Sequence, residues 1–105
     1  MSIYAGVRIV CAANRNSDGV IIIGLRHFDQ VMHKQIKELK LLAEASGAEV
    51  DDSYFDFKEQ GFICNRYQYH NRQQAWKIAS AAGQIIRHVG GNESKGGTLY
   101  SENLY

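Results

Sequence analysis

The chain of 105 residues contains no proline, only two cysteines and no marked excess of either charge. Without proline, a proline-rich linker or an SH3-type ligand segment is excluded. Cys11 and Cys64 lie far apart and form no CxxC or Cys/His pattern, which indicates neither a zinc site nor a disulfide framework. We expect both to be buried free thiols. The formal net charge of +1, from 12 basic and 11 acidic residues, gives no broad positive field of the kind that many nucleic-acid-binding proteins carry. Any anion site must therefore be local.

Long apolar runs are also missing. No stretch reaches the roughly 18 apolar residues that a membrane-spanning helix needs. The start, MSIYAGVRIV, lacks the basic region and long apolar core of a signal peptide. We therefore expect a soluble, cytoplasmic protein. With 45% hydrophobic residues, the chain suits one small domain, and domains of this size often gain stability from oligomerisation.

The first quarter of the chain predicts a β-hairpin. Ile3 to Ala13 is rich in β-branched and small residues, Asn14 to Gly19 (NRNSDG) has turn chemistry, and Val20 to Gly24 is a run of β-formers. The first four residues of that run, 20–23, are all apolar, so we expect both faces of the second strand to be covered. It is then either a central strand of one chain or a strand with another subunit on one face.

An amphipathic helix is predicted from Phe28 to Ser46, where apolar residues recur at spacings of three and four. Asp29 is its expected N-cap and Gly47 its expected end. Lysines and glutamates interleave on its other side, which favours a solvated face over a nucleic-acid-binding stripe. The aspartates that follow, at 51 and 52, lack the fixed ligand offsets of a calcium loop, so no metal site is predicted.

The segment from Gln60 to Gln84 joins a probable strand, a polar turn and the best-marked helix of the chain. A short strand over Phe62 to Cys64 precedes a second strand over Tyr67 to His70. Asn71 is a good N-cap, and Gln74 three residues later completes a capping box. Together with the first hairpin and helix, this pattern predicts a single α+β domain.

The same segment carries the clearest binding chemistry. The eight residues 65–72 hold two arginines, two tyrosines, two asparagines and a histidine, directly before a helix start whose free N–H groups attract anions. This favours a phosphate-bearing ligand. Phe62 and Arg72 flank the turn, where an aromatic face can stack on a base and a guanidinium can hold a phosphate. The alternative is a core phenylalanine and an exposed arginine.

Two other segments are candidates for the same site. Arg26 and His27 follow the second strand, a position from which polar side chains often reach a ligand; the alternative is a solvated arginine and a histidine bonded to the backbone. The glycine-rich segment at about 90–97 matches no phosphate-loop pattern and is interpreted as a flexible linker. The tail from Leu99 to Tyr105 (LYSENLY) holds two leucines and two tyrosines, so we expect it to dock on the domain or on a neighbouring subunit.

Several of these motifs occur together in a known family. The region from Gly24 to Asp29, the Gln60-Gly61-Phe62 motif, the Asn71-Arg72 helix start and the closing LYSENLY resemble the phage anti-Thoeris sponges, Thoeris anti-defence type one. The resemblance covers most of the chain through short motifs. The tail of that family usually reads Ser-Glu-Asp-Leu, and here Asn103 replaces the aspartate. Any role that needs a carboxylate at this position is lost.

The resemblance implies a protein that catalyses nothing and uses no cofactor. Such sponges bind and sequester cyclic ADP-ribose isomers, including glycocyclic ADP-ribose, which TIR-domain enzymes make in the infected bacterium, and so block Thoeris immunity. Some members also hold cyclic trinucleotides of CBASS immunity at separate sites. The implied fold is an antiparallel sheet with two helices, assembled as a homodimer or homohexamer with ligand sites at subunit interfaces.

A cyclic ADP-ribose ligand offers an adenine, a pyrophosphate and ribose hydroxyls. The resemblance implies stacking by Phe62 or a nearby tyrosine, phosphate binding by arginines, and hydroxyl binding by small polar side chains. The expected ligand-binding set is Arg26, His27, Phe62, Asn71, Arg72, Arg87, Tyr100, Ser101 and Asn103. A ligand contact by Asn71 competes with its role as a helix cap.

Two other functions remain open. A small hydrolase of the same nucleotide signals would use His27 or His70 as its acid–base group, but no nucleophile or metal-ligand motif surrounds the histidines. A nucleic-acid-binding module would use Tyr67, Tyr69 and Arg66 for stacking and phosphate contacts. The near-neutral charge argues against the second alternative.

Overall fold

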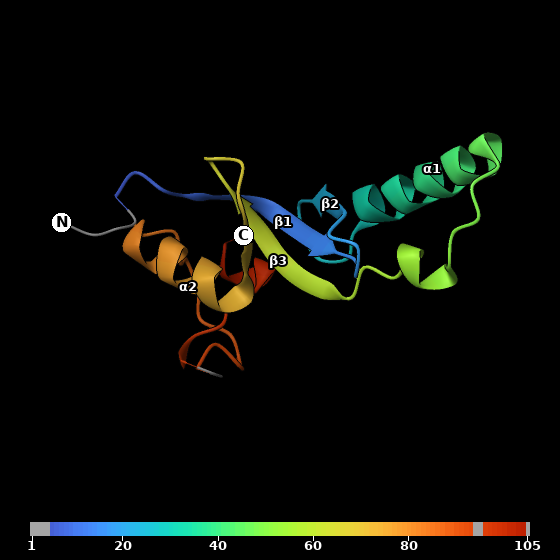
Figure 1. The fold of residues 1–105 in the computed structure, drawn as a ribbon. Helices are drawn as coiled ribbons and strands as arrows, with labels where there is room; N and C mark the ends of the chain where they lie inside the picture. Colours follow the sequence, from blue (N-terminus) through green and yellow to red (C-terminus); the bar gives the residue numbers. More distant parts are fainter. Residues whose placement is uncertain (1–4, 94–95, 105) are drawn as a thin grey trace.

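The structure, a computed structural model, describes residues 5–93 and 96–104 (Figure 1). Within this part of the chain lie two α-helices and a four-stranded antiparallel sheet, which confirms the predicted α+β class. The molecule is elongated, with principal extents of 50 × 28 × 22 Å. Its elements are β1 (Ile9–Arg15), β2 (Ile21–Gly24), α1 (Gln30–Ser46), the 3-10 helix η1 (Asp52–Phe55), β3 (Glu59–Cys64), β4 (Tyr69–Asn71), α2 (Arg72–Ala81) and the 3-10 helix η3 (Ser101–Asn103).

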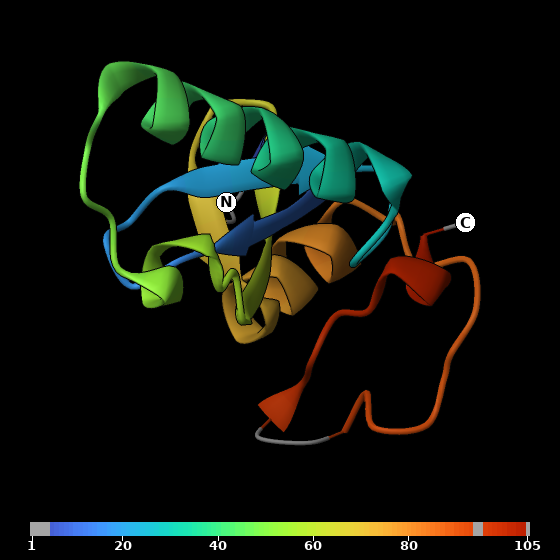
Figure 2. The same ribbon diagram turned by 90° about the vertical axis from the view of Figure 1, so that its right-hand side faces the viewer.

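The sheet has the strand order β2-β1-β3-β4, and every neighbouring pair is antiparallel. Ala12 of β1 lies opposite both Gly24 and Phe62, so these residues share one face of the sheet. The hydrophobic core forms on this face, where Ala12 and Phe62 pack with Met32 of α1 and Ile78 of α2. Figure 2 shows α1 running beside β2, with α2 and the C-terminal segment at the other end of the sheet.

The first hairpin forms as predicted, with shifted ends. Its loop is closed by the Asn16 side chain, whose Oδ1 accepts hydrogen bonds from the backbone N–H groups of Asp18 (3.0 Å) and Val20 (2.8 Å). β1 begins at Ile9 and continues to Arg15, beyond the predicted end. The predicted start of this strand at Ile3 lies outside the described residues.

The prediction that β2 is a central strand of one chain is wrong, whereas the alternative, coverage of one face by another subunit, stays a prediction. β2 is an edge strand, and its side chains alternate between the core and solvent. Ile22 is 2% exposed, whereas Ile21 and Ile23 are 38% and 46% exposed. The apolar run at 20–23 thus lies in a strand whose outer face, with Ile21 and Ile23, is not covered by the described residues of its own chain.

Both helix starts match the sequence signals. Asp29 caps α1 by accepting a hydrogen bond from the N–H of Met32 (3.1 Å), and Gly47 ends that helix in the left-handed conformation (φ 69°). Asn71 accepts from the N–H of Gln74 (2.8 Å), while the Gln74 side chain accepts from the N–H of Asn71 (3.3 Å). This is the predicted capping box. No helix in the described ranges is long and apolar enough to cross a membrane.

The C-terminal segment packs on the domain beside α2. Leu99 has no exposed surface and belongs to the core, and its N–H donates to the carbonyl of Arg72 (3.0 Å). Gly97 lies against the Trp76 ring so closely that a Cβ at this position would clash with the indole. Ser94 and Lys95 of the glycine-rich segment, and Tyr105 of the tail, lie outside the described residues.

Replacing Leu99 with alanine should lower the free energy of unfolding by about 2–5 kcal/mol, because the substitution leaves a cavity in the core. The measurement is urea unfolding followed by circular dichroism. Ile86→Ala is the matched control: Ile86 is largely exposed, so its replacement should change stability by less than about 0.5 kcal/mol. Equal stabilities of the two variants would contradict the docking of the C-terminal segment.

Candidate functional site

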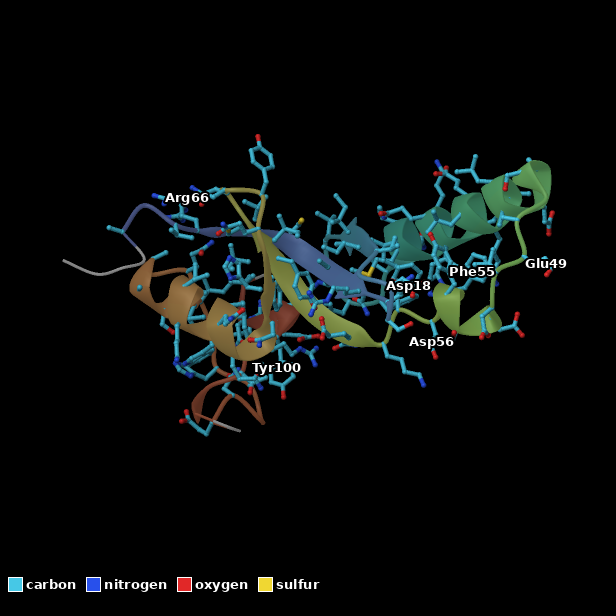
Figure 3. The ribbon with its side chains drawn as sticks, viewed as in Figure 1. Asp18, Glu49, Phe55, Asp56, Arg66 and Tyr100 are labelled. Carbon is cyan, nitrogen blue, oxygen red and sulfur yellow. The ribbon has the colours of Figure 1, made fainter. Side chains whose placement is uncertain are left out.

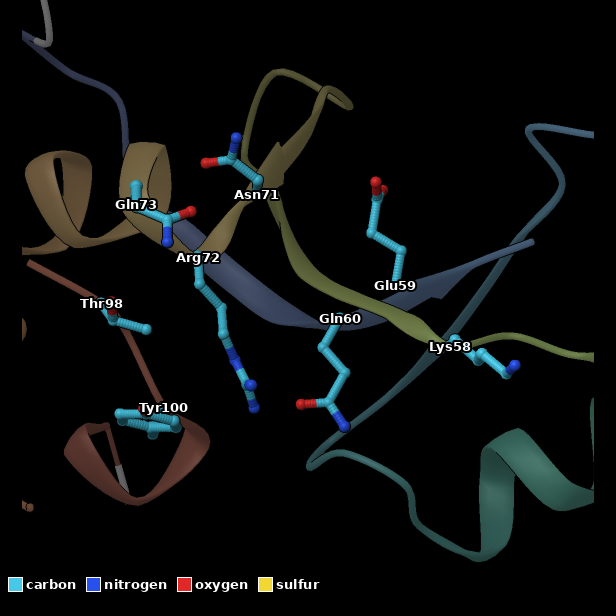
Figure 4. Close-up of a pocket in the computed structure, with 8 residues that line it drawn as sticks. All are labelled: Lys58, Glu59, Gln60, Asn71, Arg72, Gln73, Thr98 and Tyr100. Atoms are coloured by element: carbon cyan, nitrogen blue, oxygen red, sulfur yellow. The ribbon is translucent and has the colours of Figure 1, made fainter. Parts of the chain in front are cut away.

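A polar cleft of about 640 Å³ lies where β3, the start of α2 and the C-terminal segment meet (Figure 4). Its size falls within the range of small-ligand pockets, roughly 300–1,000 Å³. The three segments are far apart in the sequence and are brought together by the β3–β4 hairpin and by the docked tail. The lining residues are Lys58, Glu59, Gln60, Asn71, Arg72, Gln73, Thr98 and Tyr100.

Arg72 is the chemical centre of this cleft. Its guanidinium carbon lies 4.7 Å from the centroid of the Tyr100 ring, in cation–π geometry. Its Nε is buried and has no hydrogen-bond partner among the described residues. Burial lowers the pKa of Arg72, and the nearby Tyr100 and Glu102 act in the opposite direction. Figure 4 shows the guanidinium between Tyr100 and Gln60. The cleft therefore presents a half-buried cation that an anionic group can satisfy.

A buried pair of asparagine side chains holds Tyr100 in place. The amides of Asn92 and Asn103 exchange two hydrogen bonds, of 2.8 and 2.9 Å. Asn103 Oδ1 also accepts from the N–H of Tyr100 (2.8 Å), and its Nδ2 also donates to the carbonyl of Arg87 (2.8 Å). Both groups of the Asn103 side chain are thus used within the fold, and the residue is fully buried. An asparagine suits this position because the site needs a donor as well as an acceptor.

His27 is half-buried and lies outside the residues that line the cleft. Its Nε2 lies 2.7 Å from the carbonyl oxygen of Gly61, which assigns the ring proton to Nε2, and its Nδ1 accepts from Ser101 Oγ at 3.0 Å. The ring contacts Phe62 edge to face, with 4.8 Å between centroids. Burial lowers the pKa of His27, partly offset by the bond to Gly61. His27 therefore ties the tail to β3 as a neutral ring.

Of the sequence-predicted site residues, the structure places Asn71, Arg72 and Tyr100 in the cleft lining. Asn71 acts as the helix cap through its Oδ1 and also lines the cleft, so its predicted ligand contact stays a prediction. The others are absent from the cleft lining. Four are partly or fully buried, namely His27, Phe62, Ser101 and Asn103, and two are exposed, Arg26 and Arg87.

Phe62 has no exposed surface, so its ring is not available to stack on a base in this structure. Phe62 is therefore a core phenylalanine, as the alternative interpretation of the sequence predicted. The backbone carbonyl of Arg87 contacts the tail, where it accepts a hydrogen bond from the Asn103 side chain. The aromatic ring that lines the cleft is Tyr100, and Arg72 covers one of its faces.

Several lining residues carry no sequence signal, namely Lys58, Glu59, Gln73 and Thr98. Gln60 belongs to the Gln60-Gly61-Phe62 motif but was not among the expected site residues. Sheet pairing and tail docking bring residues 58–60 next to the start of α2 and the C-terminal segment. Gln60 and Arg72 are 12 positions apart but approach the same space in Figure 4. Alternation along β3 places Gln60 on the core side of the sheet, the side on which the tail packs.

A second polar cleft of about 340 Å³ adjoins the first and shares Lys58 and Glu59 with it. Its cations are already paired: Arg15 Nε lies 2.6 Å from Glu59, and Lys58 Nζ lies 3.1 Å from Asp56. Arg15 also stacks over the Tyr69 ring at 4.5 Å. The hydrogen bond with Arg15 lowers the pKa of Glu59 despite its partial desolvation. Among the described residues, then, the unpaired buried cationic nitrogen lies in the first cleft.

The fold and the cleft together define a small α+β protein with a half-buried arginine in a polar cleft. A family model, described as phage T4 y16D protein, matches residues 8–105. The chain belongs to this family of phage proteins. No curated protein and no solved structure matches it.

Stability should fall as the pH is lowered from about 6.5 toward 5. Burial lowers the pKa values of both His27 and His70, so below their ordinary value near 6.5 the unfolded chain takes up protons that the folded chain does not. The contribution of the two histidines to the free energy of unfolding is therefore full above pH 6.5, and it is lost as the pH falls from about 6.5 toward 5. Unfolding in urea at several pH values measures it. In His27→Gln, we expect the free energy of unfolding to change less with pH. A wild-type free energy of unfolding that does not change with pH would contradict the buried, neutral state of the histidines.

Asn103→Asp should lower the free energy of unfolding by about 2–4 kcal/mol at pH 7, because it removes a buried donor and turns a carboxylate toward the oxygens of Arg87 and Asn92. Asn65→Asp is the matched control. It removes one exposed amide donor to Gly6 and should cost less than about 1 kcal/mol. Urea midpoints compare the two, and a fully stable Asn103→Asp protein would rule out the paired-amide role.

Proposed function

We propose that this phage protein is a binding protein that sequesters a cyclic ADP-ribose isomer in the cytoplasm of the infected bacterium and so blocks Thoeris immunity. One observation carries the proposal: the half-buried Arg72 guanidinium lies on the Tyr100 ring with its Nε unpartnered among the described residues, inside a cleft of ligand size. Membership of a phage protein family supports it. The resemblance of the sequence motifs to the anti-Thoeris sponges supplies the ligand class.

The cleft chemistry suits each part of such a ligand. Arg72 would contact the pyrophosphate through two of its guanidinium nitrogens. Lys58 also lines the cleft, but its charge is paired with Asp56. Since Tyr100 already covers one face of the guanidinium, an adenine would stack on the other face, as bases do on arginine planes in nucleic-acid complexes. The Gln60 and Gln73 amides offer donors and acceptors for ribose hydroxyls. The stacking role thus passes from Phe62 to the Arg72–Tyr100 pair.

Binding without catalysis fits the positions of the candidate acid–base groups. His27 and His70, the residues that a hydrolase would use, are not among the residues that line the cleft. Both ring nitrogens of His27 are bonded within the fold, and His70 Nε2 lies 3.3 Å from the thiol of Cys64. A sponge acts stoichiometrically, so its ligand must bind tightly; a nanomolar Kd corresponds to about −12 kcal/mol.

Native mass spectrometry of the purified protein with a panel of cyclic ADP-ribose isomers, cyclic trinucleotides and a short oligonucleotide tests the proposal. We expect one cyclic ADP-ribose isomer to give a stable adduct and to be recovered intact after heat release. Recovery of a cleaved nucleotide would establish the hydrolase instead. A steeply salt-dependent oligonucleotide adduct would establish the nucleic-acid-binding module. Absence of every nucleotide adduct would refute the proposal.

Arg72→Gln should weaken binding of the cyclic ADP-ribose isomer by about 100-fold or more, because it removes the charge and the fork that hold the pyrophosphate. Tyr100→Leu should weaken it less, by roughly tenfold, through loss of the platform. Arg66→Gln is the matched control: this exposed arginine lies outside the cleft lining, and its loss should leave Kd within about twofold. Titration calorimetry gives all three values. Equal weakening by Arg66→Gln would place the site elsewhere.

A further inference from the structure

The polar cleft has two halves, because it passes around a free edge of β3. β4 pairs with β3 only as far as Asn71, which lies opposite Gly61, so no described strand flanks residues 58–60 on the side away from β1. Successive side chains of a strand point to opposite faces of the sheet. Glu59 therefore lies on one side of β3 and Gln60 on the other, as Figure 4 shows.

The two halves differ in charge. Arg72 and Tyr100 lie on the side of Gln60, and we name these three residues the cationic half (Figure 4). Asn71 lies on the side of Glu59, and we name this pair the acidic half. A ligand that fills the whole cleft must therefore place an anionic group in the cationic half and hydrogen-bond donors in the acidic half.

Arg15 fixes the Glu59 carboxylate and keeps it ionised. Arg15 Nε lies 2.6 Å from Glu59 Oε2, and the guanidinium carbon lies 4.5 Å from the centroid of the Tyr69 ring. The hydrogen bond with Arg15 lowers the pKa of Glu59, and burial acts in the opposite direction. The Glu59 side chain is nevertheless 47% exposed. At neutral pH the cleft thus presents a held carboxylate that accepts hydrogen bonds and donates none.

The acidic half suits a ribose better than a phosphate. Asn71 Oδ1 is used by the helix cap, so the Nδ2 group is the donor that this side chain offers a ligand. Ribose hydroxyls both donate and accept, and a carboxylate is a common partner for them in nucleotide sites. A phosphate in the same place would meet the like charge of Glu59. Arg15 could not reach it directly, because Arg15 lines the neighbouring cleft and not this one.

We propose that Glu59 is the residue that selects an unphosphorylated ribose: its carboxylate accepts hydrogen bonds from the hydroxyls of the adenosine ribose and excludes nucleotides that carry a phosphate there. The inference rests on the proposed function, because it takes the adenine to lie on Arg72, from where the attached ribose reaches across the free edge of β3. The Gln60 and Gln73 amides then serve the other ribose. The protein thus binds signals made from NAD and rejects the phosphorylated ones made from NADP.

Titration calorimetry at low salt with cyclic ADP-ribose and with its 2′-phosphate tests the role of Glu59. The two hydroxyls of a ribose are adjacent, so a phosphate on either lies beside the carboxylate. The wild type should bind the unphosphorylated probe more tightly by about tenfold or more, because the phosphate meets a like charge. In Glu59→Gln this ratio should fall to about threefold or less, or reverse, since the charge of Arg15 is no longer neutralised.

Glu49→Gln is the matched control, because it makes the same chemical change at an exposed position. In Figure 3 Glu49 lies beside the far end of α1, whereas Tyr100 marks the cleft. Its replacement should leave the ratio of the two affinities within about twofold of the wild type, since exposed charges at this distance are screened. Both variants should give the circular dichroism spectrum of the wild type, because exposed ion pairs contribute little to stability.

Three outcomes would overturn the inference. Equal wild-type affinities for the two probes would remove the role of Glu59 and leave the proposed function standing. A Glu59→Gln protein that binds both probes more weakly, with their ratio unchanged, would show that Glu59 acts only by holding Arg15. A wild type that binds neither probe would also overturn this inference, whereas the panel of cyclic ADP-ribose isomers decides the proposed function.

Discussion

The candidate site depends on one buried interaction, the reciprocal hydrogen bonding of the Asn92 and Asn103 side chains. Each amide group also bonds to the backbone of a different segment, which joins the loop after α2 to the C-terminal residues. Leaving one such buried group unpaired costs about 1–3 kcal/mol, whereas the complete set satisfies every donor and acceptor. This pair fixes Tyr100 where Arg72 can lie against it.

That placement gives a nearly neutral chain a local, half-buried positive charge. Burial opposes the charge of Arg72, and the Tyr100 ring compensates only part of the lost hydration. Arg15 and Lys58, by contrast, are neutralised by carboxylates at the surface. The buried guanidinium therefore has the most to gain from an anionic ligand, although the net charge of the protein is only +1.

The sheet separates two kinds of surface by strand order. β4 and the start of α2 lie at one edge and form the polar cleft, while β2 and α1 lie at the other and expose isoleucines and leucines. A chain of this size buries only a modest share of its apolar surface. The apolar side chains exposed at one end of the sheet are therefore separate from the polar cleft at the other end.

The local elements could be predicted from the chain: the caps at Asp29 and Asn71, the stop at Gly47 and the α+β class all follow from interactions within a few residues. Arg72 and Tyr100 were also among the predicted site residues. The assembled fold was needed to show that Phe62, with Ser101 and Asn103, is buried, that Gln60 shares a cleft with Arg72, and that β2 is an edge strand. Those outcomes depend on strand order and on tail docking, which join positions far apart in the chain and leave no periodic signal in the sequence.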